Sequence, residues 1–332
     1  MAGVPADRGG ARRVKVVLDM DTGVDDAVAI ALAAGSPELE LLALTSVAGN
    51  APVELCTRNC LLITELLGLD VPVARGAEAP LSKSLLTAQE VHGADGLGGH
   101  LGTLPEPAGS PVAEPAHELL SALPREHPGD ITLVTTGPLT NVAAALARDP
   151  EAVSLYRRVV CMGGAFGVPG NTGPVAEFNV YVDPEAAASV LASGLEITLV
   201  PLDATTGAVL PRGVLEGRVR TRPLAGPRPG RDVAAVLHRA LDHYIEFQFD
   251  ESGLDGGYMH DPLAVAAALD EDILETERFP VAVVTDGWDR GLTRRDAATG
   301  GRGVRVAFGH DVASFRRLLE ERVLVPVFGR PA

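Results

Sequence analysis

Short runs of aliphatic and β-branched residues alternate with longer Ala- and Leu-rich stretches along most of the chain. The short runs have the length and composition of buried strands, whereas the longer stretches have the spacing of helices. This alternation predicts an α/β fold with an open, mostly parallel, Rossmann-like central sheet flanked by helices. The predicted strands are residues 14–18, 39–47, 131–135, 158–162, 197–202, 280–285 and 304–308.

The predicted helices lie between these strands, at residues 26–34, 53–67, 113–123, 139–147, 184–192, 232–249, 262–269 and 312–322. Two of them have a clear start signal, because Asp183 precedes Pro184 and Asp261 precedes Pro262. Aspartate caps a helix and proline suits its first turn. Residues 75–102 and 211–230 have the composition of long loops. Loops of that length inside a compact domain usually carry binding elements.

Length and composition favour a single large domain. The chain has 332 residues, of which 46% are hydrophobic and 22% charged, so it can bury a large core. We expect one domain over residues 14–332, preceded by a disordered segment at residues 1–13, which is rich in Gly, Ala and Arg.

Charge and cysteine content exclude several classes of partner. The formal charge is 28 − 44 = −16, which argues against binding to nucleic acid. We find neither a signal-peptide core nor an apolar stretch of membrane-spanning length, so we expect a cytoplasmic protein without a membrane partner. Cys56, Cys60 and Cys161 are an odd number without a CxxC pair, which argues against a disulfide framework or a thiolate metal site.

Four aspartates lie within eight residues where the first predicted strand meets the first predicted helix: Asp19, Asp21, Asp25 and Asp26. Burying several ionised carboxylates without compensation is costly, so these groups either face water or surround a cation. Carboxylate oxygens suit Ca²⁺ or Mg²⁺ better than zinc, which prefers nitrogen and sulfur. The sequence therefore predicts a metal site at the end of a strand.

Polar residues also follow other predicted strands. Asn50 comes after the second strand and Thr136 after the third, and the fourth is followed by a segment with Asn171, Glu177 and Asn179. In an open parallel sheet these positions converge on one crevice. Amides and carboxylates without arginine suit a neutral polyhydroxylated ligand such as a sugar, whereas a phosphate requires cations or a glycine-rich helix start.

Each feature also has a purely structural interpretation. The aspartates suit an exposed helix start, Asn50 suits a left-handed turn, and His260 beside Asp261 suits a helix N-terminus. An EF-hand is excluded by spacing, because Val24 and Ile30 occupy the positions that need glycine and glutamate. These interpretations do not explain why polar residues recur at the same end of successive strands.

The segment Asp19-Met20-Asp21-Thr22-Gly23-Val24-Asp25-Asp26-Ala27 resembles the DxDPGxDDA signature of the inosine-uridine preferring nucleoside hydrolases. Further family blocks follow in order: residues 47–50 (VAGN), 92–98 (HGADGLG), 136–141 (TGPLTN), 162–164 (MGG), 177–179 (EFN), 183–187 (DPEAA), 254–256 (LDG) and 260–262 (HDP). The resemblance covers about residues 14–268. Two features depart from the family pattern: Thr22 replaces the usual proline, and the segment from Met162 to Asn171 is one residue longer.

The resemblance implies calcium-dependent hydrolysis of the N-glycosidic bond of ribonucleosides. In such an enzyme Ca²⁺ is held by Asp21, Asp26, the backbone carbonyl of Thr136 and Asp261, together with water and two ribose hydroxyls. Asp21 deprotonates the attacking water, and the bond breaks through an oxocarbenium-like state.

The resemblance also implies roles for the residues that bind substrate. Asp25 accepts from the ribose 2′-hydroxyl, Asn50 and Asn179 hold hydroxyls near the metal, and Met162 lies against the substrate. Asn171 and Glu177 bind the 5′-hydroxyl. His260 is the candidate that protonates or stabilises the departing base, because its proton is readily lost near neutral pH, and His92 helps to close the site.

The nucleobase and the quaternary structure stay open. Tyr244, Phe247, Gln248, Phe249 and Tyr258 are candidates for the base pocket. The resemblance implies a homodimer or homotetramer.

Two other functions are compatible with parts of the sequence. A haloacid-dehalogenase-like phosphatase also has a DxD motif after a strand, but it needs glycine before threonine, whereas Thr22 precedes Gly23. A non-catalytic nucleoside- or ribose-binding protein on the same scaffold is the other alternative.

Overall fold

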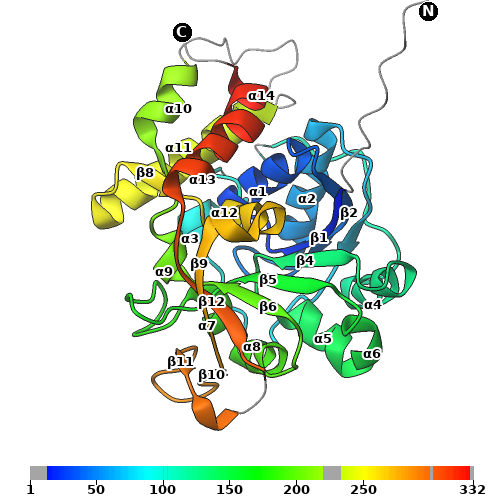
Figure 1. Ribbon diagram of the computed structural model, residues 1–332. Helices are drawn as coiled ribbons and strands as arrows, with labels where there is room; N and C mark the ends of the chain where they lie inside the picture. Colours follow the sequence, from blue (N-terminus) through cyan, green and yellow to red (C-terminus); the bar gives the residue numbers. More distant parts are fainter. Residues whose placement is uncertain (1–12, 100, 103, 220–232, 300–301, 330–332) are drawn as a thin grey trace, which may run out of the picture.

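The computed structural model describes residues 13–99, 101–102, 104–219, 233–299 and 302–329 (Figure 1). An eight-stranded sheet has the order β3-β2-β1-β4-β5-β6-β12-β9, and every neighbouring pair is parallel except β12 with β9. Its strands are β1 (Val14–Met20), β2 (Leu39–Ser46), β3 (Val73–Arg75), β4 (Ile131–Thr135), β5 (Arg158–Met162), β6 (Ile197–Val200), β9 (Leu274–Phe279) and β12 (Val304–His310). The predicted fold class is confirmed: an open, mostly parallel sheet flanked by helices in a single domain.

Helices cover both faces of the sheet (Figure 1). One face carries α1 (Val24–Ala34), α2 (Val53–Leu67), α11 (Val233–Ser252) and α12 (His260–Leu269). The other face carries α4 (Ala116–Glu126), α5 (Thr140–Arg148), α6 (Pro150–Val153) and α8 (Pro184–Leu191). The alternation of side chains along β1 serves both layers, because Val16, Leu18 and Met20 join the first core and Val17 joins the second.

The remaining elements are short. They are the helices α3 (Gln89–His92), α7 (Phe178–Val182), α9 (Leu202–Thr205), α10 (Arg212–Val219), α13 (Val312–Leu319) and α14 (Val325–Phe328), a π-helical stretch η3 (Glu320–Leu324), two 3-10 turns η1 (Glu271–Ile273) and η2 (Ala297–Thr299), and the pairs β7 (Val209–Pro211) with β8 (Gly256–Tyr258) and β10 (Val281–Val283) with β11 (Thr293–Arg295).

The strand order determines where a ligand can bind. β1 lies between β2 and β4, and the chain returns to the sheet on the other side of β1 at that point. In open α/β sheets the crevice forms at this switch, outside the carboxyl ends of the strands. The segments that follow β1, β2, β4 and β5 therefore meet at one edge, as the sequence predicted.

Most predicted elements are confirmed, and some predicted boundaries are identical to those observed: 131–135, 158–162 and 53–67. The predicted strand 280–285 is confirmed in part, as the shorter β10 (Val281–Val283), but it does not belong to the central sheet. The sheet strand is β9, whose residues Glu275–Arg278 are exposed at the sheet edge and lack a hydrophobic pattern, while Val281–Val283 forms a separate hairpin. The predicted loop 211–230 contains helix α10, and its residues 220–230 lie outside the described residues. Residues 1–12 also lie outside them, so the predicted domain boundary stays a prediction.

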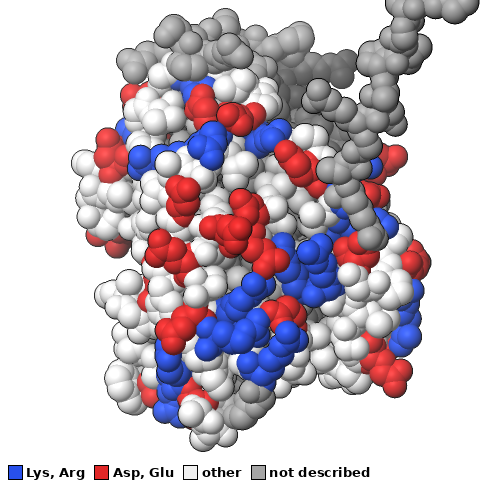
Figure 2. Space-filling model, in the orientation of Figure 1, with Lys and Arg blue, Asp and Glu red and all other residues white. Residues whose placement is uncertain are grey.

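Arginines from distant parts of the sequence gather on the face in Figure 2, over β5, β9 and β12. They are paired with two glutamates: Arg158 and Arg305 with Glu271, and Arg278 with Glu196. These ion pairs neutralise the arginines named here. None of the described helices combines the length and the apolar composition that crossing a membrane requires.

Asn141 joins three parts of the sheet edge, and its removal tests how much that junction contributes. Its amide donates to Asp19 Oδ1 at 2.7 Å and to the carbonyl of Ser46 at 2.9 Å, and its Oδ1 accepts the Ala77 N–H at 2.8 Å. We expect Asn141→Ala to lower the free energy of unfolding by about 2–4 kcal/mol, because these buried groups lose their partners. Urea unfolding followed by circular dichroism measures the change.

Arg148→Ala is the matched control for this prediction. Arg148 lies on the same helix, but its side chain is 64% exposed and forms a surface ion pair with Glu118. We expect a change within about 0.5 kcal/mol. A loss below about 1 kcal/mol for Asn141→Ala would contradict the structural role of the amide.

Candidate active site

The loop after β1 carries three aspartates from the strand into the first turn of α1. β1 ends at Met20, Asp21 follows it, and Asp25 and Asp26 lie in the first helical turn. Acidic side chains are favoured there because a helix N-terminus carries partial positive charge. All three aspartates are buried, so this junction presents its carboxylates inside the protein.

Two glycines make room for the loop. A Cβ atom on Gly49 would lie 2.1 Å from Oδ2 of Asp21, and one on Gly23 would lie 2.6 Å from Nδ1 of His92. Both distances are far below van der Waals contact, so these positions require glycine. The close approach at Gly49 lets the backbone N–H of Asn50 donate to Asp21 Oδ2 at 2.7 Å.

Thr22 occupies the position at which the family signature has proline. Its hydroxyl lies 2.7 Å from Sγ of Cys60, and its carbonyl accepts from the Asn59 amide at 3.1 Å. Hydrogen-bonding contacts of Thr22 therefore hold the loop at the position where the family signature has the rigid ring of proline. Cys56 and Cys60 are free and buried.

Asp25, Asp26 and Asp261 form a carboxylate cluster whose oxygen atoms lie within 4.8 Å of one another. Asp261 comes from the first turn of α12, and its backbone N–H lies 3.4 Å from Asp25 Oδ2. Burial, followed by the charge of Asp26, raises the pKa of Asp25 to about 7. Burial also raises the pKa of Asp261 well above its usual range. Carboxylates buried so closely repel one another unless a cation lies between them.

Asp26 and Asp21 differ in how their oxygens are used. Asp26 accepts from the Thr136 hydroxyl at 2.7 Å, the Gly23 N–H at 2.7 Å and the Asn50 amide at 3.2 Å. In contrast, Oδ1 of Asp21 is buried and has no hydrogen-bond partner among the described residues. Burial, together with the charge of Asp26, raises the pKa of Asp21 well above its usual range. An unpartnered carboxylate oxygen beside further buried carboxylates fits a divalent cation.

Asp19 has a separate role from the other aspartates of the run. It lies within β1, and its Oδ1 accepts from the Thr45 hydroxyl at 2.5 Å and the Asn141 amide at 2.7 Å. Burial raises the pKa of Asp19 to about 6. These contacts tie β1 to β2 and α5, so Asp19 supports the sheet edge beneath the cluster.

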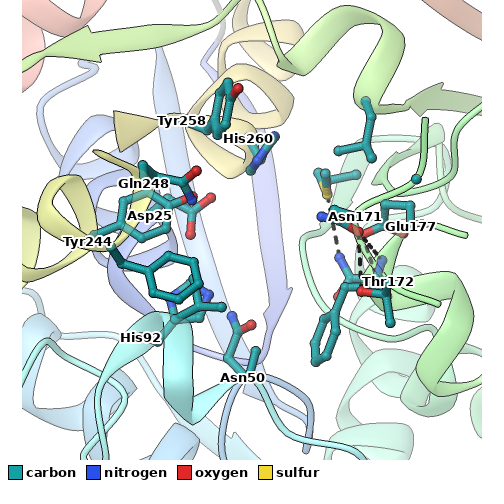
Figure 3. A pocket seen from close by; sticks show the side chains of 18 of the residues that line it. Asp25, Asn50, His92, Asn171, Thr172, Glu177, Tyr244, Gln248, Tyr258 and His260 are labelled. Carbon is teal, nitrogen blue, oxygen red and sulfur yellow. Dashed lines mark hydrogen bonds between the residues drawn. The ribbon is translucent and has the colours of Figure 1, made fainter. Parts of the chain in front are cut away.

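Glu177 forms part of the opposite wall of the site, where it caps helix α7. Its two oxygens accept the backbone N–H groups of Asn179, Gly164 and Val180 at 2.9, 3.0 and 3.1 Å. Burial raises the pKa of Glu177 to about 6. The cap fixes the carboxylate at the side of the cavity that faces Asp25 (Figure 3).

Asn171 and Asn179 complete this wall. Oδ1 of Asn171 accepts the Phe178 N–H at 2.9 Å, and Figure 3 shows Asn171 beside Glu177. The longer segment before Asn171 therefore still delivers it to the predicted place. The amide of Asn179 donates to the Thr136 carbonyl at 2.7 Å, which joins this wall to the carboxylate cluster.

His92 lies on the same side of the cavity as Asp25 (Figure 3). Its Nδ1 accepts the Val24 N–H at 3.1 Å, and its ring stacks on Tyr244 with centroids 5.6 Å apart. Burial lowers the pKa of His92 to about 3. The ring is therefore neutral at pH 7, and because Nδ1 accepts a hydrogen bond, Nε2 carries the proton.

His260 begins α12 and faces the cavity near Asp25 (Figure 3). Its Nδ1 lies 2.7 Å from the Thr205 hydroxyl, and its ring stacks on Tyr258 at 5.1 Å. Burial lowers the pKa of His260 to about 4. The expectation that this histidine exchanges its proton near neutral pH is therefore wrong in this environment, where the ring is already neutral.

These side chains surround a cavity of about 850 Å³. The predicted site residues that line it are Asp25, Asn50, His92, Thr136, Met162, Asn171, Glu177, Asn179, His260 and Asp261. Asp21 and Asp26 lie behind this lining, and each accepts a hydrogen bond from Asn50. The fold thus brings together all the residues that the sequence placed in the site.

Helix α11 forms one wall, and the sequence analysis found it only in part. Tyr244, Phe247, Gln248, Glu251 and Ser252 line the cavity, at the spacing of one helix face. The sequence did not single out Glu251 or Ser252, nor Glu90 on α3, although the helical spacing contained the signal for the first two. Phe249 was predicted near the base but is 52% exposed and points away from this face.

A family model described as inosine-uridine preferring nucleoside hydrolase matches residues 16–317 of the chain. The match includes every residue of the cluster and of both walls. It spans 302 residues, from 317 − 16 + 1, and therefore more than half of the 332-residue chain.

Individual relatives agree with the family match. The chain is 42% identical over 282 residues to the pyrimidine-specific ribonucleoside hydrolase RihA of Klebsiella pneumoniae, which covers 84% of this chain and 87% of the relative. A solved plant nucleoside hydrolase is 34% identical with a TM-score of 0.84, covering 93% of this chain and 98% of its own. The purine-preferring ribonucleoside hydrolase from Gardnerella vaginalis is 32% identical with a TM-score of 0.86. The match covers 95% of this chain and 99% of that structure.

The raised pKa values predict how the stability of the metal-free protein depends on pH. Asp19 and Glu177 titrate near 6 and Asp25 near 7 in the folded protein, whereas unfolded carboxyls titrate near 4. Groups with a raised folded pKa contribute stability that is complete below about pH 4 and is lost as pH passes through 6 and 7. We therefore expect the melting temperature in chelator to fall between about pH 5 and about pH 8.

Calcium and one variant distinguish the cluster from other titrating groups. Excess Ca²⁺ should raise the melting temperature more at about pH 8 than at about pH 5, because ionised carboxylates bind it. Asp25→Asn should reduce the pH dependence in chelator, and Asp250→Asn, an exposed change on α11, should not. A metal-free protein that is equally stable at both pH values would contradict the buried-cluster analysis.

Proposed function

The chain belongs to the inosine-uridine preferring nucleoside hydrolase family and is a hydrolase of N-glycosyl bonds in ribonucleosides, and from this premise we propose that its reaction depends on Ca²⁺. The observation that carries the proposal is the buried cluster of Asp25, Asp26 and Asp261 with the unpartnered oxygen of Asp21 beside it. Every donor in this set is oxygen, which favours Ca²⁺ over zinc.

The residues that would hold the ion are Asp21, Asp26, Asp261 and the backbone carbonyl of Thr136. Asp25 also belongs to the cluster, and we assign it to the ribose 2′-hydroxyl because it lines the cavity whereas Asp26 lies behind. When bound, the ion supplies a Lewis acid that increases the acidity of water and binds ribose hydroxyls.

Asp21 is the proposed general base. Its Oδ2 is fixed by the Asn50 N–H, so Oδ1 is left to take the proton of the attacking water. As the C1′–N bond lengthens, positive charge develops on the ribose, and the surrounding carboxylates stabilise it.

The remaining polar residues position the sugar. Asn50 and Asn179 flank the carboxylate cluster and bind hydroxyls near it, whereas Asn171 and Glu177 on the opposite wall bind the 5′-hydroxyl. Met162 supplies an apolar surface between them. Contacts at both ends of the ribose orient C1′ toward Asp21.

His260 and His92 act on the base side of the cavity. Both rings are neutral at pH 7, so we propose that His260 stabilises the departing base by a hydrogen bond from a neutral imidazole rather than from an imidazolium. His92 holds the N-terminus of α1 through Val24 and offers its Nε2–H to the cavity. It closes the site without exchanging a proton.

The alternatives from the sequence are less well supported. A phosphatase lacks support from the family match, and no lysine or arginine occurs among the described residues that line the cavity. A non-catalytic binder is disfavoured by the family match and by the relatives, which are named hydrolases.

Pyrimidine ribonucleosides are the proposed preferred substrates. The relative at 42% identity is named pyrimidine-specific, whereas the one at 32% is named purine-preferring. Gln248 lines the cavity and its amide both donates and accepts, which suits the carbonyl and imide edge of uracil. The homodimer or homotetramer and the cytoplasmic location stay predictions, of which light scattering on the purified protein tests the first.

The decisive experiment measures free ribose released from uridine, cytidine, inosine and adenosine, with and without chelator. We expect release from ribonucleosides that stops in chelator and returns with added Ca²⁺. Release that is unaffected by complete removal of divalent ions would overturn the proposed calcium dependence. Faster turnover of inosine than of uridine would overturn the pyrimidine preference.

Replacing the proposed base tests the role of Asp21. Asp21→Asn keeps the shape of the side chain but removes the proton acceptor, so we expect kcat for uridine to fall by at least about 10³-fold. Calcium titration by calorimetry separates loss of the base from loss of a ligand, and Asp250→Asn is the exposed control. A kcat within tenfold of the unchanged enzyme at saturating Ca²⁺ would refute this role.

Replacing His260 tests the assistance given to the leaving group. We expect His260→Ala to lower kcat/KM for uridine by about 10²-fold or more, whereas p-nitrophenyl riboside should lose less than about tenfold because its leaving group departs readily. Thr205→Val should cause a smaller loss in the same direction, since Thr205 only positions the ring. Equal losses on both substrates would exclude a leaving-group role for His260.

A further inference from the structure

The hairpin of β10 and β11 lies outside the central sheet and packs beside α8 (Figure 1). None of residues 281–295, all of which the structure describes, lines the cavity. The hairpin nevertheless contacts the two segments that surround Glu177, namely residues 163–167 and 176–181. It therefore lies directly behind one wall of the site.

Thr293 of β11 holds the first of these segments. Its side chain is buried, and its hydroxyl accepts the Ala165 N–H at 3.0 Å and donates to the Ala165 carbonyl at 2.7 Å. A threonine hydroxyl can donate and accept at once, so one side chain satisfies both backbone groups of Ala165. Without that hydroxyl these buried groups would lose their partner.

The turn that Thr293 holds also binds Glu177. Gly164 donates its N–H to Glu177 Oε2 at 3.0 Å, and the next residue is Ala165. Gly164 has a φ of +84°, and a Cβ atom on it would lie 3.1 Å from Oγ1 of Thr293. The left-handed backbone favours glycine at this position. Thr293 and Glu177 thus contact adjacent residues of one tight turn.

Arg290 and Gly291 hold the second segment. Arg290 donates from Nε and Nη2 to the Tyr181 carbonyl at 3.2 and 2.8 Å, and its guanidinium lies 4.1 Å from the centre of the Tyr181 ring. Tyr181 belongs to α7, the helix that Glu177 caps. A Cβ atom on Gly291 would lie 2.7 Å from Cβ of Ala176, which directly precedes Glu177. The hairpin therefore fixes the helix as well as the turn.

Aromatic packing connects the same turn to the edge of the sheet. The ring of Phe166 packs against Phe279 of β9 and Phe308 of β12, with centroids 5.6 and 6.2 Å apart. The guanidinium of Arg295, on β11, lies 4.0 Å from the centre of the Phe279 ring. The turn, the hairpin and two strands of the sheet edge are thus packed together.

We propose that the β10–β11 hairpin positions the Glu177 carboxylate to bind the 5′-hydroxyl of ribose, with Thr293 and Arg290 as the positioning residues. The inference rests on the proposed function, in which Asn171 and Glu177 bind that hydroxyl. It assigns a part in the reaction to two residues that do not line the cavity.

The placement of Glu177 matters because its oxygens are almost fully used. They accept the N–H groups of Asn179, Gly164 and Val180. A carboxylate has about four acceptor sites, so these three bonds determine where a hydroxyl can donate. Movement of the turn or of α7 therefore shifts the bound 5′-hydroxyl, and with it the C1′ atom that must face Asp21.

A matched pair of substrates tests Thr293. Uridine carries the 5′-hydroxyl, and 5′-deoxyuridine lacks it. For Thr293→Val we expect kcat/KM for uridine to fall by about tenfold, whereas kcat/KM for 5′-deoxyuridine should change by less than about twofold, because it has no 5′-hydroxyl to misplace. Thr293→Ser keeps the hydroxyl group and should restore most of the rate with uridine. Release of uracil followed by ultraviolet absorbance measures both substrates.

Arg290→Ala repeats the test at a half-buried position and decides it if Thr293→Val does not fold. We expect a loss of about three- to fivefold with uridine and less than about twofold with 5′-deoxyuridine. Thr276→Val makes the same change as Thr293→Val at an exposed position on β9. This control should leave both rates unchanged.

The outcomes separate this inference from the proposed function. If the hairpin only stabilised the fold, the variants would lose equal rate on both substrates, and this result or no loss on either would overturn the inference while leaving the proposed function intact. Equal kcat/KM for uridine and 5′-deoxyuridine in the unchanged enzyme would overturn the assigned 5′-hydroxyl contact and the inference together. No release of uracil from either substrate with Ca²⁺ present would overturn the proposed function itself.

Discussion

The structure depends on one electrostatic constraint: several carboxylates are buried together at the end of β1, and none of the described lysines or arginines lines the cavity beside them. Asp25, Asp26 and Asp261 lie within 4.8 Å of one another, and Asp21 keeps one oxygen without a partner. Such an arrangement is unfavourable until a cation neutralises it. Backbone features compensate in part, since the N-terminus of α1 favours its acidic first turn and Gly49 allows the Asn50 N–H to reach Asp21. The remaining repulsion makes the cluster a candidate site for a divalent ion.

The sequence predicted which of these side chains come together because much of the signal is local. Asp21, Asp25 and Asp26 lie at one strand-to-helix junction, and Asn50 and Thr136 follow neighbouring strands, so the parallel sheet alone brings them together. The sequence could not separate Asp19 from the other aspartates, because the distinction depends on Thr45 and Asn141 from other elements. It also misjudged the titration of His260, because burial of the ring is a tertiary property. The edge strand β9 was missed for a related reason: an exposed edge needs no hydrophobic pattern.

The base side of the cavity shows a different limit on what the sequence can predict. Glu251 and Ser252 share a helix face with Tyr244, Phe247 and Gln248, and this periodicity is visible in the sequence. Periodicity identifies a face but not what the face contacts, since the same spacing also describes residues buried in a core. Only the packing of α11 against α1 and α3 shows that part of this face lines a cavity.

His92 connects helix α1, which carries Asp25 and Asp26, with helix α11, which forms a wall of the cavity. Its Nδ1 caps α1 through the Val24 N–H, while its ring stacks on Tyr244 of α11. The loop behind it is held by Asp95, whose Oδ1 accepts the N–H groups of Leu97 and Gly99 and whose backbone carbonyl accepts from the Asn59 amide. Asn59 of α2 also donates to the Thr22 carbonyl. A series of contacts therefore runs from the loop after β1 through α2 and the segment around His92 and Asp95 to the wall formed by α11. Direct contacts thus connect the wall formed by α11 with the helix that carries Asp25 and Asp26.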